Sequence, residues 1–278
     1  MSDYIKSPLN YVGGKYKLLN DIIPLFPSKI GTFIDVFAGG FNVGINVKAN
    51  KIIYNDIEYH LVGLMEHIKQ TSTEQLLYEI DNIISKFGLR KDESEGFLKL
   101  RDVYNAGDNT SMMFYTMVCY AFNYQIRFNG SGKYNMPSGK NRSSFNPALR
   151  KKFILFADAL HEKDCTFESK QFYDLNFSKL TENDFVYCDP PYFNSVAAYN
   201  ENGGWSEKEE IKLLDILDGL NDVGIKFALS NNLKYNNPIL EKWRTKYFTH
   251  YINGDYSNCN YHKKDRSGDK EVLIKNYK

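Results

Sequence analysis

The tetrapeptide Asp189-Pro190-Pro191-Tyr192 carries the residue types of this chain that are best suited to chemistry. It follows the largely apolar run 184–188, and two successive prolines end a strand because neither has an N–H group to pair. The strand end would then present a carboxylate, a prolyl carbonyl and an aromatic face together. These groups accept hydrogen bonds from an exocyclic amine and stack on a planar base. The pattern predicts a site for an amine-bearing heterocycle, although Asp-Pro-Pro is also an ordinary turn after a buried strand.

A βαβ unit is expected to help position this site. Residues 32–37 form an apolar strand, 38–40 a glycine turn, 42–50 a helix and 51–54 a second strand that ends at Asp56. The acid follows the glycines by a little under the roughly 20 residues expected between a dinucleotide-binding turn and its ribose-binding acid. The unit therefore predicts an adenosine-containing ligand at the carboxyl ends of the strands, although many βαβ units bind nothing there.

The carboxyl half of the chain continues the alternation of strands and helices. A helix is expected over 206–220 from its apolar spacing, with Ser206 and Glu209 as a capping box. Further strands are expected at 165–168, 184–188, 225–230, 247–252 and 271–275. The chain is thus predicted to have an α/β fold, with a Rossmann-like sheet.

The stretch from about residue 59 to residue 150 exceeds the length of a normal crossover between strands. Helical patterns occur at 75–87, 93–104 and 111–122, and polar sequence containing glycine follows. We expect a helical domain with a basic hairpin to be inserted into the α/β domain. The α/β domain then comprises residues 1–58 and 151–278, and the insert comprises residues 59–150.

The segment 126–152 contains no acidic residue, whereas the whole chain has 35 Lys and Arg against 34 Asp and Glu. Such a segment is suited to contact a phosphate backbone, although a run of charge is also typical of a solvated surface. Its basic residues are Arg127, Lys133, Lys140, Arg142, Arg150, Lys151 and Lys152.

The composition excludes several other classes of protein. The 4 cysteines and 5 histidines are scattered, so we expect no metal site. The stretch 1–19 lacks the apolar core of a signal peptide, and no apolar run approaches the roughly 18 residues of a membrane span. We expect a cytoplasmic protein with reduced thiols and no membrane association.

Near the amino terminus, Asn10-Tyr-Val-Gly-Gly-Lys15 precedes a helical stretch. A glycine pair lets the backbone approach a ligand closely, and Lys15 is placed to meet a carboxylate. With this motif the chain resembles the Dam-type DNA adenine-N6 methyltransferases of the α-group, over nearly its whole length. The resemblance rests on motifs in a specific order, namely 11–15, Asp35-Val-Phe-Ala-Gly-Gly40, Asn55-Asp56, Ile126-Arg-Phe-Asn129, 137–140, 189–192 and 271–274.

The resemblance implies a site-specific, adenine-specific DNA methyltransferase with S-adenosylmethionine as cofactor. The catalytic motif would comprise Asp189, Pro190, Pro191 and Tyr192. Asp189 and the Pro190 carbonyl would accept hydrogen bonds from the target amine, and Tyr192 would stack on the flipped adenine. Tyr199 would cover its other face. The residues that the resemblance places at the cofactor are Tyr11, Lys15, Asp35, Phe37, Gly39, Gly40, Asp56, Phe172 and Asp189. A core phenylalanine is an equally good interpretation of Phe172.

The resemblance also implies contacts with double-stranded DNA. Arg127 matches the position that reads a guanine, and Tyr124 and Gln125 precede it where relatives carry wedging or base-contacting residues. The remaining DNA-binding residues are expected to be Asn129, Lys133, Pro137, Lys140, Arg142 and Tyr199. The expected target is GATC or a site containing GAT.

The chain departs from the family pattern at two motifs. The turn reads Phe37-Ala-Gly-Gly40, as in the phage variant, and Pro137-Ser138-Gly139 lacks the usual central aromatic residue. Gln125 also differs from the residue expected in a strict GATC reader, so the target sequence is less constrained than the reaction.

Rival functions stay open at this point. They are N4-cytosine methylation, a catalytically silent DNA-binding relative, and methylation of RNA or of a protein glutamine. We expect a monomer, and the sequence leaves open whether a cognate restriction endonuclease is a partner.

Overall fold

The computed structural model describes residues 4–194, 204–252 and 270–278. Its centre is a mixed sheet of 7 strands in the order β3-β2-β1-β4-β5-β7-β6. The strands are β1 (Thr32–Asp35), β2 (Lys51–Asn55), β3 (Cys165–Glu168), β4 (Phe185–Cys188), β5 (Lys226–Asn232), β6 (Phe248–Tyr251) and β7 (Glu271–Lys275). Strands β1 to β5 pair in parallel, and β7 is antiparallel to both β5 and β6. The predicted α/β fold is confirmed.

Eight α-helices accompany the sheet in the described residues. They are α1 (Leu19–Ile22), α2 (Tyr59–Gln70), α3 (Thr73–Phe87), α4 (Glu95–Asn105), α5 (Ser111–Tyr120), α6 (Pro147–His161), α7 (Glu207–Asp222) and α8 (Pro238–Trp243). Side-chain caps explain where several begin, since Ser72, Thr110 and Asn146 each accept from a backbone N–H of the first turn. The predicted capping box of Ser206 and Glu209 is present at α7. No helix in the described parts of the chain is long and apolar enough to cross a membrane.

The helix expected over residues 42–50 is wrong. Only a short 3₁₀ turn, η3 (Gly44–Asn46), forms there. The side chains of Asn42 and Asn46 accept from the backbone N–H groups of Ser7 and Ile5, at 3.0 and 2.8 Å, so they hold the amino-terminal segment instead. Asparagine often takes such a role outside helices, and the β-branched neighbours add little helix propensity.

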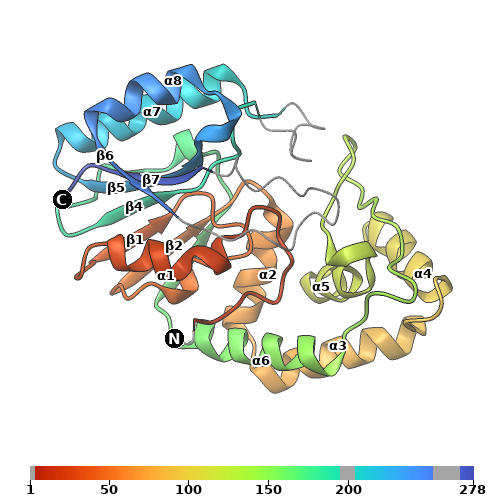
Figure 1. Cartoon of the computed structure of the whole chain (residues 1–278). Coiled ribbons are helices and arrows are strands. Elements are labelled where there is room, and N and C mark those ends of the chain that lie inside the picture. Colours follow the sequence, from red (N-terminus) through yellow and green to blue (C-terminus); the bar gives the residue numbers. More distant parts are fainter. Residues whose placement is uncertain (1–3, 195–203, 253–269) are drawn as a thin grey trace.

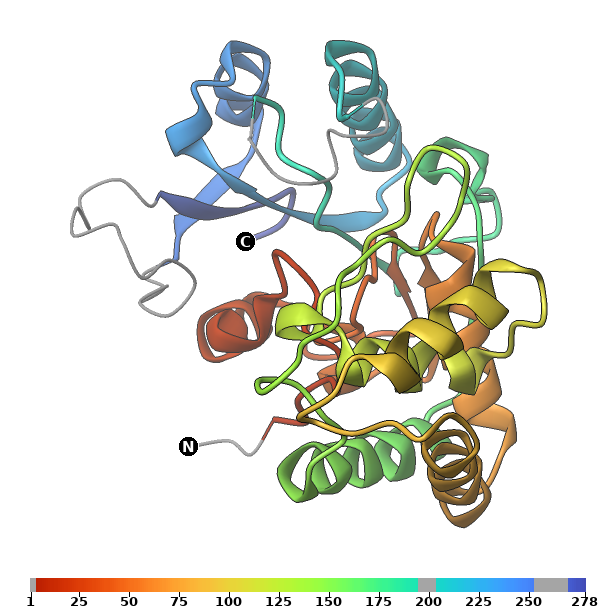
Figure 2. The same ribbon diagram turned by 90° about the vertical axis from the view of Figure 1, so that its right-hand side faces the viewer.

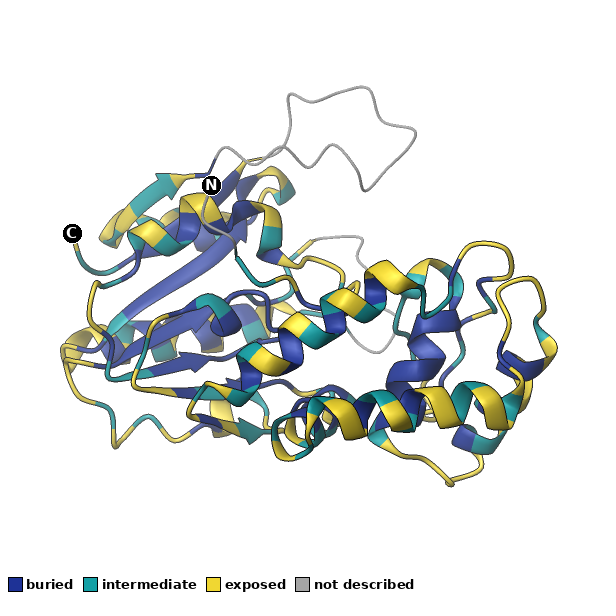
Figure 3. Ribbon diagram, turned by 90° about the horizontal axis from the view of Figure 1, so that it is seen from below, coloured by how far each residue is buried: buried dark blue, intermediate teal, exposed yellow. Residues whose placement is uncertain are grey.

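Alternating side chains of the strands build a core on each face of the sheet. Phe33 and Tyr187 belong to one buried cluster, whereas Ile34 and Val186, one position away in their strands, belong to another. Helices α7 and α8 cover the second face, and α1 and α2 lie on the first (Figure 1). The strands are mostly buried, while the outer helices carry exposed stripes (Figure 3).

Helices α3, α4 and α5 lie beside the sheet rather than on it (Figure 1). Their buried residues, such as Leu76 and Phe114, join the same cluster as Phe33 of β1. The predicted domain boundary at residue 150 falls within α6. The division into an inserted and a catalytic domain therefore stays a prediction.

Candidate active site

The site lies at the carboxyl ends of β1, β2 and β4. From β1 the sheet extends to β2 and β3 on one side and to β4 and β5 on the other, which makes a topological switch point between β1 and β4. In open α/β sheets a crevice for ligands forms at such a point. Asp35 ends β1, Asp56 follows β2 and Asp189 follows β4. The sheet thus brings together three acids that are up to 154 residues apart.

The glycine turn after β1 is clamped from three sides. Gly39 has a φ of +49°, and a Cβ atom there would lie 2.8 Å from the ring of Tyr11. Its N–H donates to Asp56 Oδ2 at 2.8 Å, and its carbonyl accepts from the Tyr54 hydroxyl at 2.7 Å. The turn therefore requires glycine, and Tyr11 and Asp56 both lie against Gly39. Their contact with a cofactor stays a prediction.

Two of the crevice acids are buried without a neighbouring cation of their own in the described contacts. Burial, with the charge of Asp189 next in importance, raises the pKa of Asp35 from 3.8 to about 8. Burial also raises the pKa of Asp56 to about 6, although N–H groups of Glu58 and Gly39 oppose the shift. Buried carboxyl groups of this kind favour a cationic ligand, because it would relieve their mutual repulsion.

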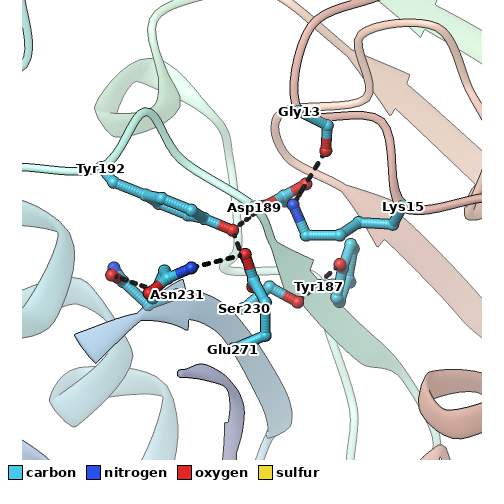
Figure 4. Close-up of polar contacts among 9 residues, drawn as sticks. Gly13, Lys15, Tyr187, Asp189, Tyr192, Ser230, Asn231 and Glu271 are labelled. Carbon is cyan, nitrogen blue, oxygen red and sulfur yellow. Dashed lines mark hydrogen bonds and ion pairs between the residues drawn. The ribbon is translucent and has the colours of Figure 1, made fainter. Parts of the chain in front are cut away.

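The DPPY segment meets the amino-terminal glycine motif. Lys15, only 3% exposed, places its Nζ 2.7 Å from Asp189 Oδ2 and 2.9 Å from the Gly13 carbonyl (Figure 4). The same Nζ lies 5.3 Å from the centre of the Tyr192 ring. Burial raises the pKa of Asp189, and the Lys15 ammonium and the Tyr192 hydroxyl oppose that shift. Lys15 thus favours the ionised form of Asp189, which sequence reasoning did not foresee.

An aromatic cluster forms beside the glycine turn. The ring of Phe172 lies 5.6 Å from that of Phe37 and 5.3 Å from that of Trp205. Phe172 is 3% exposed and belongs to the core on the α7 side. This position is compatible with both interpretations of Phe172, as a core residue and as a partner of the cofactor adenine. Its role at the cofactor stays a prediction.

Most of the predicted DNA-contacting residues lie on a hairpin, residues 121–139, which is held by isolated bridges between Ala121 and Ser138 and between Phe128 and Tyr134. Figure 2 shows it as a yellow-green loop running past α4 and α5. Asn105 of α4 hydrogen-bonds both backbone groups of Tyr134, whose hydroxyl donates to the Gln125 carbonyl at 2.8 Å. The hairpin is therefore anchored on the helices through side chains.

Within the hairpin, Arg127 is hydrogen-bonded twice to Asn135. Its Nε donates to Asn135 Oδ1 at 2.8 Å and its Nη2 to the Asn135 carbonyl at 3.2 Å. Asn129 shapes the tip, since its Oδ1 accepts from the N–H groups of Ser131 and Lys133. Asn129 thus has a clear structural role, and the DNA contacts of both residues stay predictions.

The other predicted DNA-contacting residues that the structure describes lie within this hairpin or directly after it. Tyr124 has a φ of +57°, and Asn10 donates to the carbonyl of its neighbour Asn123 at 2.9 Å. The Arg142 guanidinium lies 5.3 Å from the centre of the Phe122 ring. Lys133, Pro137, Lys140 and Arg142 are exposed, Gln125 is half-buried, and Tyr199 lies outside the described residues.

Comparison with known proteins decides the family. Residues 11–266 match the family model of D12 class N6 adenine-specific DNA methyltransferases. The chain belongs to this family. The family predicted from the motifs is therefore confirmed, and S-adenosylmethionine, the predicted cofactor, is the methyl donor of this methyltransferase family.

Several curated relatives in this methyltransferase family match almost the whole chain. It is 51% identical over 99% of its length to the type II methyltransferase M.FokI of Planomicrobium okeanokoites. It is 41% identical to the modification methylase StsI of Streptococcus sanguinis, and 25% identical over 81% of its length to the DNA adenine methylase of Escherichia coli K12. The chain spans 43% of the length of the first two relatives and 80% of the third.

Sequence reasoning placed Asn55 and Glu271 in family motifs but gave neither of them a role in this methyltransferase site. Asn55 bonds the carbonyls of Val36 and Lys170, and so ties the loops after β1 and β3 together. Glu271 of β7 accepts from the Tyr192 hydroxyl. The motif Asn55-Asp56 could have pointed to Asn55, whereas the motif 271–274 contains nothing that links residue 271 to residue 192.

Proposed function

We propose that this chain transfers a methyl group from S-adenosylmethionine to N6 of a flipped-out adenine in double-stranded DNA. The observation that carries the proposal is the convergence of Asp189, Tyr192 and Lys15 at the switch point of a sheet whose chain belongs to an adenine-specific methyltransferase family.

The residues of the crevice fit the cofactor. S-adenosylmethionine carries a net positive charge, and the crevice holds the buried acids Asp35 and Asp56 beside the ionised pair of Lys15 and Asp189. The Gly39 turn offers backbone where a larger residue would collide with Tyr11. We infer that Asp56 and the glycine turn hold the adenosine part, and Asp35 faces the cationic part.

The chain's own residues would prepare the target amine. The bound cofactor supplies a methyl group already activated by a positive sulfur. Asp189, whose ionised form is favoured by the pairing with Lys15, accepts a hydrogen bond from the N6 amine together with the Pro190 carbonyl, which keeps electron density on the nitrogen. Tyr192 stacks on the base. Alignment of the two reactants lets the nitrogen lone pair attack the methyl group without prior deprotonation. S-adenosylhomocysteine would leave, and the proton that N6 then loses would pass to Asp189 or to solvent.

The hairpin would provide recognition. Extruding a base costs about a few kcal/mol, which contacts to phosphates and neighbouring bases must offset. Arg127 is our choice for the guanine reader, and a bidentate contact there discriminates by about 1–3 kcal/mol. The target would be GATC or a site containing GAT.

The partners proposed are double-stranded DNA and a cognate restriction endonuclease. Two relatives that match the whole chain carry the names type II methyltransferase and modification methylase, which supports a role in protecting DNA. We propose that the chain acts as a monomer in the cytosol, since one flipped base per event needs one crevice.

The test is transfer of labelled methyl from S-adenosylmethionine to unmethylated plasmid DNA, followed by single-molecule sequencing. N6-methyladenine at one short motif is the expected result and names the target. Methylation of cytosine N4 would replace the proposal with the rival reaction. Absence of label on DNA, with the cofactor bound, would leave a silent DNA-binding protein.

A further inference from the structure

Glu271 is a buried acid in the crevice to which the proposed reaction gives no role. It is the first residue of β7 and pairs in register with Asn232 of β5. Its side chain is directed at the DPPY segment, 79 positions away in the sequence (Figure 4). Glu271 is 5% exposed, so its contacts inside the protein define what it does.

Both carboxylate oxygens of Glu271 are used. Oε2 accepts from the Tyr192 hydroxyl at 3.1 Å, and Oε1 accepts from Asn232 Nδ2 at 3.1 Å. Asn232 is itself held, because its Oδ1 accepts from the backbone N–H groups of Lys234 and Lys270. The acceptor offered to Tyr192 is therefore fixed by two paired strands.

The Tyr192 hydroxyl stands between two acids. It lies 3.1 Å from Glu271 Oε2 and 3.4 Å from Asp189 Oδ1. A phenol has a single proton to donate, so it satisfies one of these acceptors at a time. The shorter contact is the one to Glu271. That choice leaves Asp189 Oδ1 available, while Asp189 Oδ2 is paired with Lys15.

Placing Glu271 here is unfavourable in itself. Burial raises its pKa, the charge of Asp189 adds to the shift, and Lys15 opposes it. An apolar side chain would avoid the loss of solvation, but it would leave the Tyr192 proton to Asp189. The acid therefore makes sense as an acceptor that competes with Asp189.

We propose that Glu271 is a positioning residue for methyl transfer. By accepting the proton of the Tyr192 hydroxyl, it fixes the ring that stacks on the target base and keeps Asp189 Oδ1 free for the N6 amine. This inference rests on the proposed function. It adds a strand at the far side of the sheet to the machinery that orients the adenine.

The substitution Glu271→Gln tests this role with little change of shape. An amide has one acceptor oxygen and one donor nitrogen. Asn232 donates to one side of the group, so the oxygen stays there and the new NH₂ faces Tyr192. The hydroxyl then accepts from the amide and donates to Asp189. We expect kcat to fall about tenfold, which corresponds to the loss of one hydrogen bond. The KM for S-adenosylmethionine should stay within about twofold of the wild-type value.

The decisive variant is the double substitution Glu271→Gln with Tyr192→Phe. The phenylalanine keeps the ring and removes the competing proton, so the double variant should match Tyr192→Phe alone. Equal losses from Glu271→Gln in both backgrounds would overturn the proposal, as would wild-type kcat in Glu271→Gln. Asp184→Asn, a buried acid at the opposite end of the sheet, is the control and should lower Tm while leaving kcat unchanged.

A second readout follows the ring directly. With 2-aminopurine at the target position, stacking on a fixed Tyr192 quenches fluorescence, and Glu271→Gln should raise the signal of the bound complex. An unchanged signal would overturn the positioning role. A wild-type chain that methylates no DNA would overturn the proposed function, whereas an active wild type with additive variants would overturn only the role of Glu271.

Discussion

The crevice and the hairpin hold their functional side chains in different ways. In the crevice, Asp56 accepts from two backbone N–H groups and Asp35 from one, at the ends of fully paired strands. In the hairpin, two isolated bridges replace a continuous ladder, and side chains such as Asn129 and Asn135 shape the backbone and hold Arg127. Main-chain N–H groups of the loops after β1 and β2 thus hold Asp35 and Asp56, whereas Arg127 is held mainly by one exchangeable residue, Asn135.

Loss of the crevice acceptor should have the largest effect. Asp189→Ala removes the partner of Lys15, which is also the group that we propose orients the amine. We expect kcat to fall by at least about 10²- to 10³-fold, as for removal of a preorganised polar group, with DNA affinity kept. Single-turnover methyl transfer and gel-shift binding measure the two quantities. Retained transfer would remove Asp189 from the catalytic assignment.

A substitution in the hairpin should alter the selection of the DNA sequence rather than the rate of methyl transfer. Arg127→Ala should relax discrimination at one base pair by about 1–3 kcal/mol, while the crevice keeps its geometry. Arg142→Ala is the matched comparison, since a phosphate contact should weaken all sequences alike and reduce the salt slope by about 1. Competition between oligonucleotides at several salt concentrations separates them. Uniform weakening by Arg127→Ala would make it another phosphate contact.

The glycine turn gives a smaller test of the rigid region. Gly39→Ala places a Cβ against Tyr11 at a φ of +49°, and such strain costs about 1–3 kcal/mol. We expect a lower Tm and weaker binding of S-adenosylmethionine, and calorimetry measures both quantities. Gly63→Ala lies in α2, where a Cβ meets only ordinary contact at 3.6 Å, and should stabilise the protein slightly. Equal behaviour of the two variants would contradict the clamp around Gly39.

Per step of one pH unit, the smallest expected effect is the change in the free energy of unfolding that Asp35 causes. The pKa of Asp35 is about 8 in the folded chain against 3.8 ordinarily, so between these values the unfolded state has lost a proton that the folded state keeps. Asp35 therefore makes the free energy of unfolding fall as pH rises through this window, by at most about 1.4 kcal/mol per pH unit. Asp35→Asn, studied by urea unfolding from pH 5 to 8, should flatten that fall. Identical slopes would show that Asp35 is ionised throughout.

The sequence predicted the parts of this molecule that depend on local pattern. Strand positions, the capping box at Ser206 and the acids at strand ends follow from alternation, caps and turn residues. The helix expected over 42–50 failed because Asn42 and Asn46 bond to residues near the amino terminus, a contact that no local pattern contains. The link from Glu271 to Tyr192 was missed for the same reason, since it joins elements that meet only when the sheet is assembled.

The amino-terminal loop, residues 10–15, belongs to both regions. Asn10 bonds the backbone of the hairpin at Asn123, Tyr11 packs on the glycine turn, and Lys15 pairs with Asp189. A displacement of this loop must therefore be felt at both ends. If cofactor binding changes the affinity for DNA through this loop, DNA binding must change the affinity for the cofactor by the same factor, because such coupling is reciprocal.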